Sequence, residues 1–372
     1  MSGKGKAAVL TVAAVAAELE RIAPLRLAEE TDNVGLVIGD GGQPARKLVL
    51  AIDLTEAVVA EAARGGAGMV MAYHPPIYRP IARLVSPSPA YLAARAGLAV
   101  YSMHTALDAA QGGTNDVMAE AIGLELVRPL APVVRRDQHK IVVYTPPGDV
   151  ERVMSAAFAA GAGHIGQYSQ CSFRASGTGT FLPESGAHPA VGQVGRREEV
   201  QEQRLEFICW GRLLPRVLAA VVEAHSYEVP AIDVFPLEDR PAGTGMGRIG
   251  QLKKPLSTAA LVARVKRGLG LARVQVILPD RAGAVRNVAV GAGSCGELFR
   301  QARAAGAEAY VTGELRHHDA LAARAAGLTV ICVGHGNSER PALRAVADRL
   351  AYALPELPVA ISRADRDPLE IV

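Results

Sequence analysis

Three of the nine histidines in this 372-residue sequence follow, directly or after one glycine, short apolar runs that have the length of buried strands. They are His74, His104 and His335. Two carboxylates stand nearby, since Asp108 lies four residues after His104 and Glu339 four residues after His335. Neutral imidazoles and carboxylates are ligands of zinc, iron, manganese and cobalt, and carboxylates also bridge pairs of such ions. The spacing therefore indicates a metal site.

Each of these residues also has an ordinary structural explanation. A single histidine at the end of a strand more often makes a hydrogen bond than binds a metal. His335 and Glu339 stand one helical turn apart at the start of an expected helix, where an acidic side chain also interacts favourably with the helix dipole. The metal interpretation is favoured because ligands collect beyond the carboxyl ends of parallel strands. It assumes a strand order that brings these ends together.

The alternation of apolar runs and helical patterns indicates an α/β fold with two stretches of mostly parallel sheet covered by helices, which close into one body or into two facing lobes. In the first lobe we expect strands 48–54, 68–73 and 98–103 and helices 55–64 and 89–96. In the second we expect strands 287–292, 309–311 and 328–333 and helices 297–305, 317–326 and 338–350. An earlier helix, capped by Thr11, is predicted from the helical spacing of Val12, Val15, Leu19 and Ile22.

The middle of the chain has a different order of elements. We expect strand 140–145, helix 149–160, strands 170–181 and 204–210, helix 213–225 and strand 231–237. This β-α-β-β-α-β order is that of a ferredoxin-like domain. Borders rich in proline and glycine, Arg128–Pro132 and Arg240–Gly245, favour an insertion. We therefore expect a discontinuous α/β metal-binding body of residues 1–132 and 241–372, and an inserted ferredoxin-like domain of residues 137–240.

Two glycine-rich segments could hold phosphate, but neither is convincing. Gly245–Gly250 fits the G-x-G-x-x-G pattern, yet no strand leads into it and Pro255 follows where a helix should run, so we reject a dinucleotide fold. Gly291–Gly296 links a strand to a helix, and a tight turn explains it better than phosphate binding. The histidines of the middle region lack ligand spacing, and we interpret them as structural or surface residues: His139, His164, His188 and His225.

Composition narrows the class of protein. Hydrophobic residues make up 49% and charged residues 21%, which is typical of a globular chain. The basic residues behind the net charge of +3 are scattered, so nucleic-acid binding is unsupported. The four cysteines include no Cys-x-x-Cys pair, and we expect reduced, mostly buried thiols. The longest uncharged run, residues 153–173, is too polar to span a bilayer, so we expect a cytoplasmic protein without a membrane anchor.

Several motifs together resemble those of the Nif-three-like dinuclear metal-centre proteins, often named GTP cyclohydrolase 1 type 2 homologues. The motifs are Asp32–Gly39, Tyr73–Ile77, His104–Asp108, Thr312–Glu314 and Gly334–Glu339. Two segments of the middle region, Gly177–Phe181 and His225–Pro230, are similar to the extra PII/CutA-like domain that the longer members carry. The resemblance therefore covers most of the chain.

This resemblance implies a toroidal homohexamer, built as a trimer of dimers, with two divalent metal ions in each subunit. Carried across by motif, the ligands are His74, Asp108, His335 and Glu339. The ions would be zinc, iron, manganese or cobalt. Many bacterial members have two adjacent histidines where this chain has Tyr73 and His74, so one ligand of the pair of ions is missing here.

The family name implies a metal-dependent hydrolase that opens the guanine ring of GTP and releases formate. Catalytic roles as proton shuttles would fall to His104 or Glu314, and His317 or His318 is near enough in sequence to assist. A different class remains open, a non-enzymatic hexameric scaffold or regulatory protein that binds metal. A further alternative is a two-metal phosphoesterase.

Overall fold

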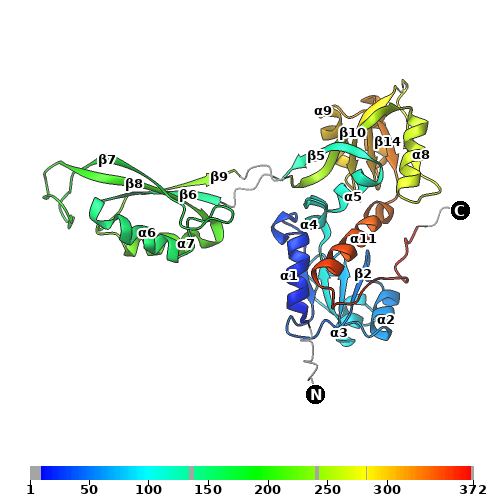
Figure 1. Cartoon of the computed structure of the whole chain (residues 1–372), viewed down its shortest axis with the longest axis horizontal. Coiled ribbons are helices and arrows are strands. Elements are labelled where there is room, and N and C mark those ends of the chain that lie inside the picture. The colour runs from blue at the N-terminus through cyan, green and yellow to red at the C-terminus, as the bar shows by residue number, and fades with distance from the viewer. Residues whose placement is uncertain (1–9, 134–137, 239–242, 282, 370–372) are drawn as a thin grey trace, which may run out of the picture. The chain divides into compact units, whose positions relative to one another are not determined.

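The computed structural model describes residues 10–133, 138–238, 243–281 and 283–369. The chain divides into two compact units, residues 1–133 with 243–372 and residues 134–242. We call the first unit the body and the second the insert (Figure 1). The body contains two sheets, and each unit is described by itself below.

The first sheet of the body has five strands in the order β1-β4-β3-β2-β15. Their bounds are Gly35–Ile38 (β1), Leu48–Ala51 (β2), Met69–Ala72 (β3), Ala99–Ser102 (β4) and Val359–Ile361 (β15). Strands β15, β2, β3 and β4 are parallel, and β1 is antiparallel. All residues of the three central strands are buried, as expected for a parallel sheet with helices on both faces.

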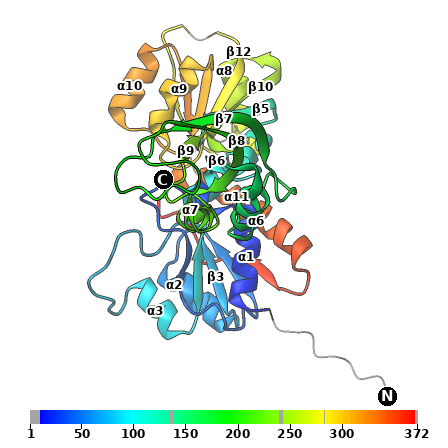
Figure 2. The ribbon, with the colours of Figure 1, turned by 90° about the vertical axis from the view of Figure 1, so that its left-hand side faces the viewer.

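Helices cover both faces of this sheet. Helices α2 (Glu56–Arg64) and α3 (Pro89–Arg95) pack on one face, and α1 (Val12–Ile22) and α11 (His335–Ala353) pack on the other (Figure 2). The predicted start of α1 is confirmed, because the Thr11 hydroxyl accepts a hydrogen bond from the Ala14 amide. Its four predicted apolar residues are all buried.

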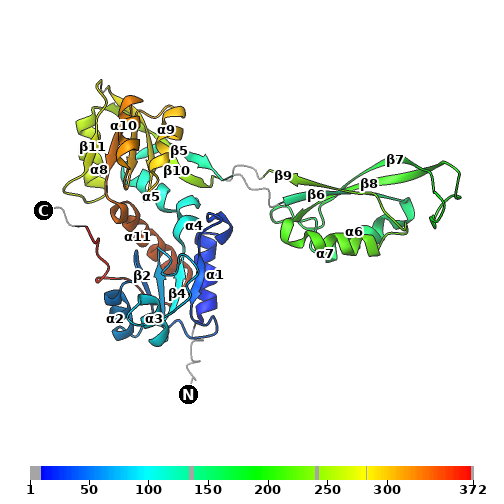
Figure 3. The same cartoon turned by 180° about the vertical axis from the view of Figure 1, so that it is seen from behind.

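The second sheet of the body has six strands in the order β11-β14-β13-β12-β10-β5. Their bounds are Leu124–Pro132 (β5), Gly245–Leu256 (β10), Gln275–Ile277 (β11), Val285–Gly291 (β12), Ala309–Thr312 (β13) and Thr329–Cys332 (β14). Strands β12, β13 and β14 are parallel, and the other pairs are antiparallel. Helices α5 (Thr114–Ala121) and α8 (Thr258–Gly268) pack on one face, and α9 (Phe299–Ala304) and α10 (His317–Ala325) pack on the other (Figure 3).

Two helices join the sheets. Helix α4 (His104–Ala109) follows β4 of the first sheet and leads into α5 on the second sheet. Helix α11 follows β14 of the second sheet, and its later residues Leu343, Val346 and Leu350 belong to the core of the first sheet. The start of α11 therefore lies where both sets of parallel strands end.

The strands and helices predicted for the two lobes are confirmed to within a few residues, but no strand was predicted at the border Arg128–Pro132. These residues lie in β5, where Arg128 pairs with Ile249 and Pro132 with Gly245. Strand β5 is at the edge of its sheet, which is where a strand tolerates proline. Of the other border, Arg240–Gly245, the first three residues fall outside the described residues. The segment Gly245–Gly250 is part of β10, so the rejection of a dinucleotide loop is confirmed.

The insert is a four-stranded antiparallel sheet with two helices on one face (Figure 1). Its elements are β6 (Gln138–Thr145), α6 (Val150–Ala159), β7 (Phe173–Phe181), β8 (Glu198–Trp210), α7 (Leu214–Glu223) and β9 (Ile232–Leu237). The strands lie in the order β7-β8-β6-β9. The predicted order of helices and strands is the order observed.

The cysteines are free, as predicted, but only Cys209 and Cys332 are buried, while Cys171 and Cys295 are half-buried. Among the helices formed by described residues, none combines the length and the apolar character needed to cross a membrane.

Candidate metal centre

Three side chains of the body converge at the start of α11. His74, His335 and Glu339 each offer one ligand atom, and these atoms lie within 4.8 Å of one another. The Nε2 atom of His335 is 3.1 Å from Oε1 of Glu339, and Nε2 of His74 is 3.4 Å from Oε2. Two imidazole nitrogens therefore face the two oxygens of a single carboxylate.

The local structure explains how residues so distant in sequence meet. His74 comes just after Tyr73 at the carboxyl end of β3, and His335 is the first residue of α11 after β14. Glu339 lies one turn further along α11, so its side chain is on the same face of the helix as His335. The ligands were predicted to lie beyond the carboxyl ends of parallel strands, and these strand ends come from both sheets, β3 of the first and β14 of the second.

The remaining nitrogen of each imidazole is held by a carboxylate. The Nδ1 atom of His74 is 2.9 Å from Oδ1 of Asp53, and Nδ1 of His335 is 3.1 Å from Oε1 of Glu314. Such a partner fixes the ring and directs Nε2 at the site, as it does in metalloproteins. Sequence reasoning missed Asp53 because the strand expected at 48–54 included it, whereas β2 ends at Ala51 and leaves Asp53 just beyond a parallel strand.

Charge is concentrated in this cluster. Burial alone would lower the pKa of His74, but hydrogen bonds to Asp53 and Glu339 raise it to about 10. The hydrogen bond to Glu339 raises the pKa of His335 to about 9. Burial works against the charge of Glu339, yet the two imidazoles hold its pKa below the ordinary value. Without a metal ion, two imidazolium protons therefore occupy the space between the rings and the carboxylate.

These pKa values predict how the stability of the metal-free protein changes with pH. Folding raises both histidine pKa values above the ordinary 6.5, so the ion pairs stabilise the fold fully below about pH 6.5. This stabilisation is lost as the pH rises through about 9 and 10. Thermal unfolding of chelator-treated protein should show a falling Tm over this range, and the fall should be smaller in the double variant His74→Gln/His335→Gln. A Tm that rises with pH in the parent would contradict the ion pairs.

The donor set fits a divalent transition-metal ion. Glu339 is only 2% exposed, and its Oε2 atom, 3.4 Å from Nε2 of His74, makes no well-aligned hydrogen bond, so a buried carboxylate oxygen is left incompletely compensated. Such an atom is costly unless a charge compensates it. Two imidazole nitrogens and one carboxylate oxygen are donors that zinc, iron, manganese and cobalt accept.

Gly293 gives Glu339 the room it needs. A Cβ atom at Gly293 would lie 2.7 Å from Oε1 of Glu339, and the residue has a φ of +64°, which disfavours any side chain. Its amide donates a hydrogen bond to the Ser338 hydroxyl, and the neighbouring Ala292 amide donates to Asn115. These amides are therefore occupied, which supports the tight-turn interpretation of Gly291–Gly296 over phosphate binding.

Replacing Gly293 by alanine should displace the Glu339 carboxylate and weaken metal binding by roughly tenfold, within the range seen when a partner of a metal ligand is lost. Gly306→Ala is the matched control, because Gly306 also has a positive φ of +85° but a Cβ there would meet nothing within 4 Å. Both substitutions introduce backbone strain, and only the first touches the site. Equal metal affinities of the two variants, measured by competition with a chelating dye, would contradict the role of Gly293.

Asp108 lies beside the three converging residues but is held by other groups. The Tyr73 hydroxyl donates a hydrogen bond to Oδ1 of Asp108 and also lies 2.8 Å from the Thr114 hydroxyl. Tyr73 is fully buried, and burial raises its pKa far above the ordinary value, so it remains a neutral phenol. Burial, followed by the negative charge of Glu339, raises the pKa of Asp108 to about 6.

The other predicted residues take different places. The His104 ring lies 5.3 Å from the His74 ring, and its Nδ1 is 2.8 Å from Oδ1 of Asp32, a partner that the sequence did not reveal. Glu314 contacts His335. His317 and His318 do not line the cavity described below: their rings contact each other at the start of α10, and His317 lines a separate surface pocket.

A cavity of about 330 Å³ adjoins the site. Its lining includes four carboxylates, namely Glu29, Asp108, Glu297 and Glu339. No lysine or arginine occurs among the described residues that line it. Cys295 also faces this space, but burial raises the pKa of its thiol well above the usual range, so it is not a thiolate nucleophile. The cavity thus attracts cations and contains the His104 ring beside the metal-ligand cluster.

The body thus has two sheets with parallel central strands, and His74, His335 and Glu339 converge where these strands end. This arrangement defines an α/β protein with a candidate metal centre. The chain belongs to the Duf34/NIF3 (NGG1p interacting factor 3) family, whose model matches residues 10–368. A GTP cyclohydrolase 1 type 2 homolog of Halalkalibacterium halodurans is 35% identical over 362 residues, which cover 95% of this chain and 96% of that protein. One of Mycobacterium bovis is 39% identical over 360 residues, or 94% of each chain.

Solved structures of relatives show the same fold. A Bacillus cereus protein related to NIF3 has 34% identity and a TM-score of 0.71, over 98% of this chain and 100% of that one. A Staphylococcus aureus protein has a TM-score of 0.82 at 23% identity, over 99% of this chain and 100% of that one. The second likeness concerns the fold alone.

Proposed function

We propose that this protein is a metal-dependent hydrolase that opens the guanine ring of GTP. The proposal rests on one observation, the convergence of His74, His335 and Glu339 beside a cavity, with each histidine held by a second carboxylate. The printed names of the relatives, GTP cyclohydrolase 1 type 2 homologs, supply the substrate class. The reaction would consume two water molecules, one to open the imidazole ring to a formyl amine and one to release formate.

The proposed cofactor is a pair of divalent ions. The three converging residues would hold the first ion, and Asp108 with Glu339 would serve a second. A bound divalent ion lowers the pKa of water towards neutrality and polarises the bond under attack. The second ion should bind more weakly, because the Tyr73 hydroxyl engages Asp108 where a ligand nitrogen would be needed.

The remaining residues would position groups and move protons. Asp32 holds Nδ1 of His104, which leaves Nε2 of His104 to take or give a proton at the cavity. Glu314 would hold His335 and accept a proton released at that side. Asp53 keeps the His74 ring in place. Removal of any of these carboxylates should lower activity less than removal of Glu339.

The activity test uses GTP with purified protein that has been stripped with a chelator and reloaded with zinc, manganese, iron or cobalt separately. We expect formate and a ring-opened nucleotide with at least one metal, and no turnover by the stripped protein. Parallel incubations contain a phosphodiester and single-stranded DNA. Full turnover of GTP without metal would remove the mechanism, whereas ester cleavage without formate would indicate a two-metal phosphoesterase.

A second candidate is a metal-binding protein that turns over no nucleotide. It is favoured by the charge of the cavity, since four carboxylates without a lysine or arginine among the described lining residues repel a triphosphate. Bound metal can offset that repulsion only in part. Stoichiometric metal binding with no product from GTP would support this candidate.

We further propose that the protein is a cytoplasmic, toroidal homohexamer, a trimer of dimers, and that the insert is a PII/CutA-like domain of the ferredoxin-like class. The order of elements in the insert supports the second statement. Light scattering after size-exclusion chromatography tests the first, with six times the chain mass of 38.9 kDa as the expected value.

A further inference from the structure

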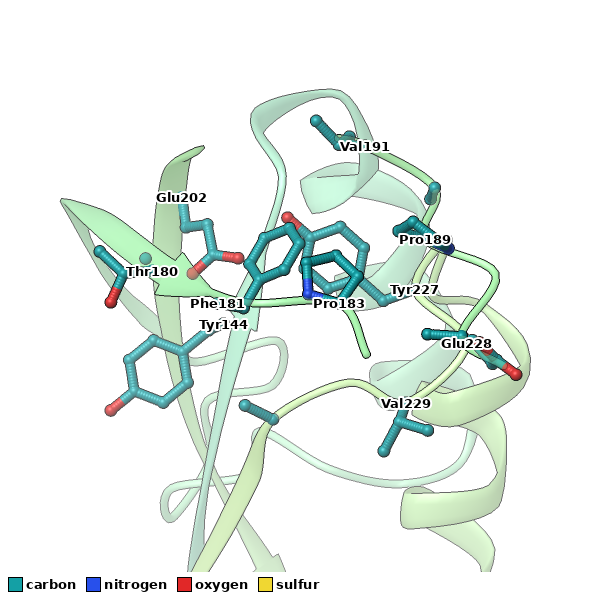
Figure 4. Close-up of a pocket in the computed structure, with 14 residues that line it drawn as sticks. Tyr144, Thr180, Phe181, Pro183, Pro189, Val191, Glu202, Tyr227, Glu228 and Val229 are labelled. Carbon is teal, nitrogen blue, oxygen red and sulfur yellow. The ribbon is translucent and has the colours of Figure 1, made fainter. Parts of the chain in front are cut away.

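The insert contains a cavity of its own, remote in sequence from the metal ligands (Figure 4). Its volume is about 450 Å³, which is within the range of small-molecule sites. Three aromatic rings contribute to its lining, those of Tyr144, Phe181 and Tyr227. Proline, alanine and valine side chains complete most of the wall. The cavity is therefore largely apolar and aromatic.

One buried carboxylate points into this apolar space. Glu202 of β8 is only 9% exposed, and Figure 4 shows its carboxylate directed towards the rings of Phe181 and Tyr227. The carboxylate lies over Gly179, where a Cβ atom would be 2.1 Å from Oε2. The absence of a side chain at Gly179 thus creates the place that Glu202 occupies.

No basic side chain compensates this charge at the cavity. Among the described residues that line it, there is no lysine, arginine or histidine. The nearest basic residue on β8, Arg204, pairs with Glu206, and Lys140 pairs with the same carboxylate. A carboxylate in apolar surroundings is unfavourable unless a cation accompanies it.

Contacts within the insert hold the aromatic rings that line the cavity. The amide of Tyr227 donates to Nδ1 of His225, and Nε2 of His225 donates to the backbone oxygen of Tyr144. His225 therefore has a structural role, which is one of the two roles that the sequence suggested. Its ring packs 4.9 Å from that of Tyr227, which in turn lies 6.1 Å from Phe181. Burial, followed by a hydrogen bond to Glu202 and the charge of that carboxylate, raises the pKa of Tyr227, so the phenol stays neutral.

We propose that this cavity binds a small organic cation, an ammonium group attached to an apolar or aromatic body. The ammonium would pair with Glu202 and lie against the ring faces, which attract cations through their quadrupoles. The apolar body would fill the space lined by Pro183, Pro189 and Val191. The insert is then a ligand-binding module whose ligand differs in charge from a nucleotide.

The chemistry of the lining disfavours other ligands. A second carboxylate, Glu228, stands at the cavity, so anions are repelled. Glu228 is exposed and accepts a hydrogen bond from the His188 amide, whereas Glu202 is the one buried carboxylate among the described lining residues. A divalent metal ion requires more oxygen or nitrogen donors than this site offers.

The binding test uses the full-length protein and three probes of similar shape in calorimetric titrations. They are phenethylammonium, the neutral phenethyl alcohol and the anionic 3-phenylpropanoate. We expect saturable binding of phenethylammonium, about tenfold weaker binding of the alcohol and none of the anion. Equal binding of cation and alcohol, or no binding of the cation, would overturn the proposal.

Two variants locate the binding. Glu202→Gln should weaken phenethylammonium binding by about tenfold and leave alcohol binding unchanged. Its matched control is Glu199→Gln, an exposed residue on the opposite face of the same strand, which should bind like the parent. Because Glu202→Gln could disturb folding, Phe181→Leu provides a second test that keeps the apolar volume and removes the ring face. Unchanged cation affinity in Glu202→Gln and Phe181→Leu, with both folded by circular dichroism, would refute the site.

Discussion

Replacing Glu339 by glutamine should lower the affinity of the protein for its first divalent ion by at least about 100-fold, the upper end of the loss seen for partners of metal ligands. The substitution keeps the shape of the side chain but removes the charge that faces both His74 and His335. It also removes the one carboxylate that the two imidazoles share. Metal content after dialysis against buffer, measured by plasma mass spectrometry, and titration with zinc check this result.

The control for this experiment is Glu356→Gln, the same substitution at an exposed residue near the end of α11. It should retain the metal content of the parent. His335→Ala should behave like Glu339→Gln. A Glu339→Gln protein that holds as much metal as the parent would show that the cluster is not the site, whatever the outcome of the GTP assay.

The second large effect concerns stability. Arg248→Met should reduce the free energy of unfolding by about 3–5 kcal/mol, as expected when one partner of a buried ion pair is removed. Arg248 is 1% exposed, and its Nε atom lies 2.6 Å from Oδ1 of Asp116. It also donates to the backbone oxygens of Ala110, Gly245 and Gly247. The substitution leaves all these acceptors without their donor.

Urea unfolding followed by circular dichroism measures this loss. Arg344→Met is the matched control, because Arg344 is exposed on α11 and pairs with Asp348 in solvent. A surface pair of this kind contributes at most about 1 kcal/mol. If the two variants lost the same stability, the buried network around Arg248 would not hold β10 against α4 and α5.

Much of the candidate site could be predicted from the sequence, because the ends of parallel strands are visible there. The strand-end argument found His74 and His335, and helical spacing added Glu339. It also selected Asp108, which lies beside the cluster and is bound to Tyr73. Asp108 is held away from the cluster by its hydrogen bond with the Tyr73 hydroxyl, and the spacing of residues in the sequence does not reveal such a contact.

Other features were not visible in the sequence for physical reasons. Asp53 and Asp32 act by holding histidines that lie 21 and 72 residues away, so only the folded chain shows the pairs. Strand β5 carries two prolines, which indicated a border rather than a strand, and its pairing with β10 depends on residues more than 100 positions later. Local propensity cannot reveal contacts of this range.

Helix α11 carries His335 and Glu339 in its first turns, and its later turns lie in the core of the first sheet, whose strand β3 leads to His74. An ion bound there would act as a cross-link between the two lobes. Chelation should therefore reduce the cooperativity of unfolding, so that the halves of the body melt in two calorimetric steps rather than one. Amide hydrogen exchange along α11 should become faster at the same time. The metal ion would then stabilise the contact between the lobes in addition to its proposed part in catalysis.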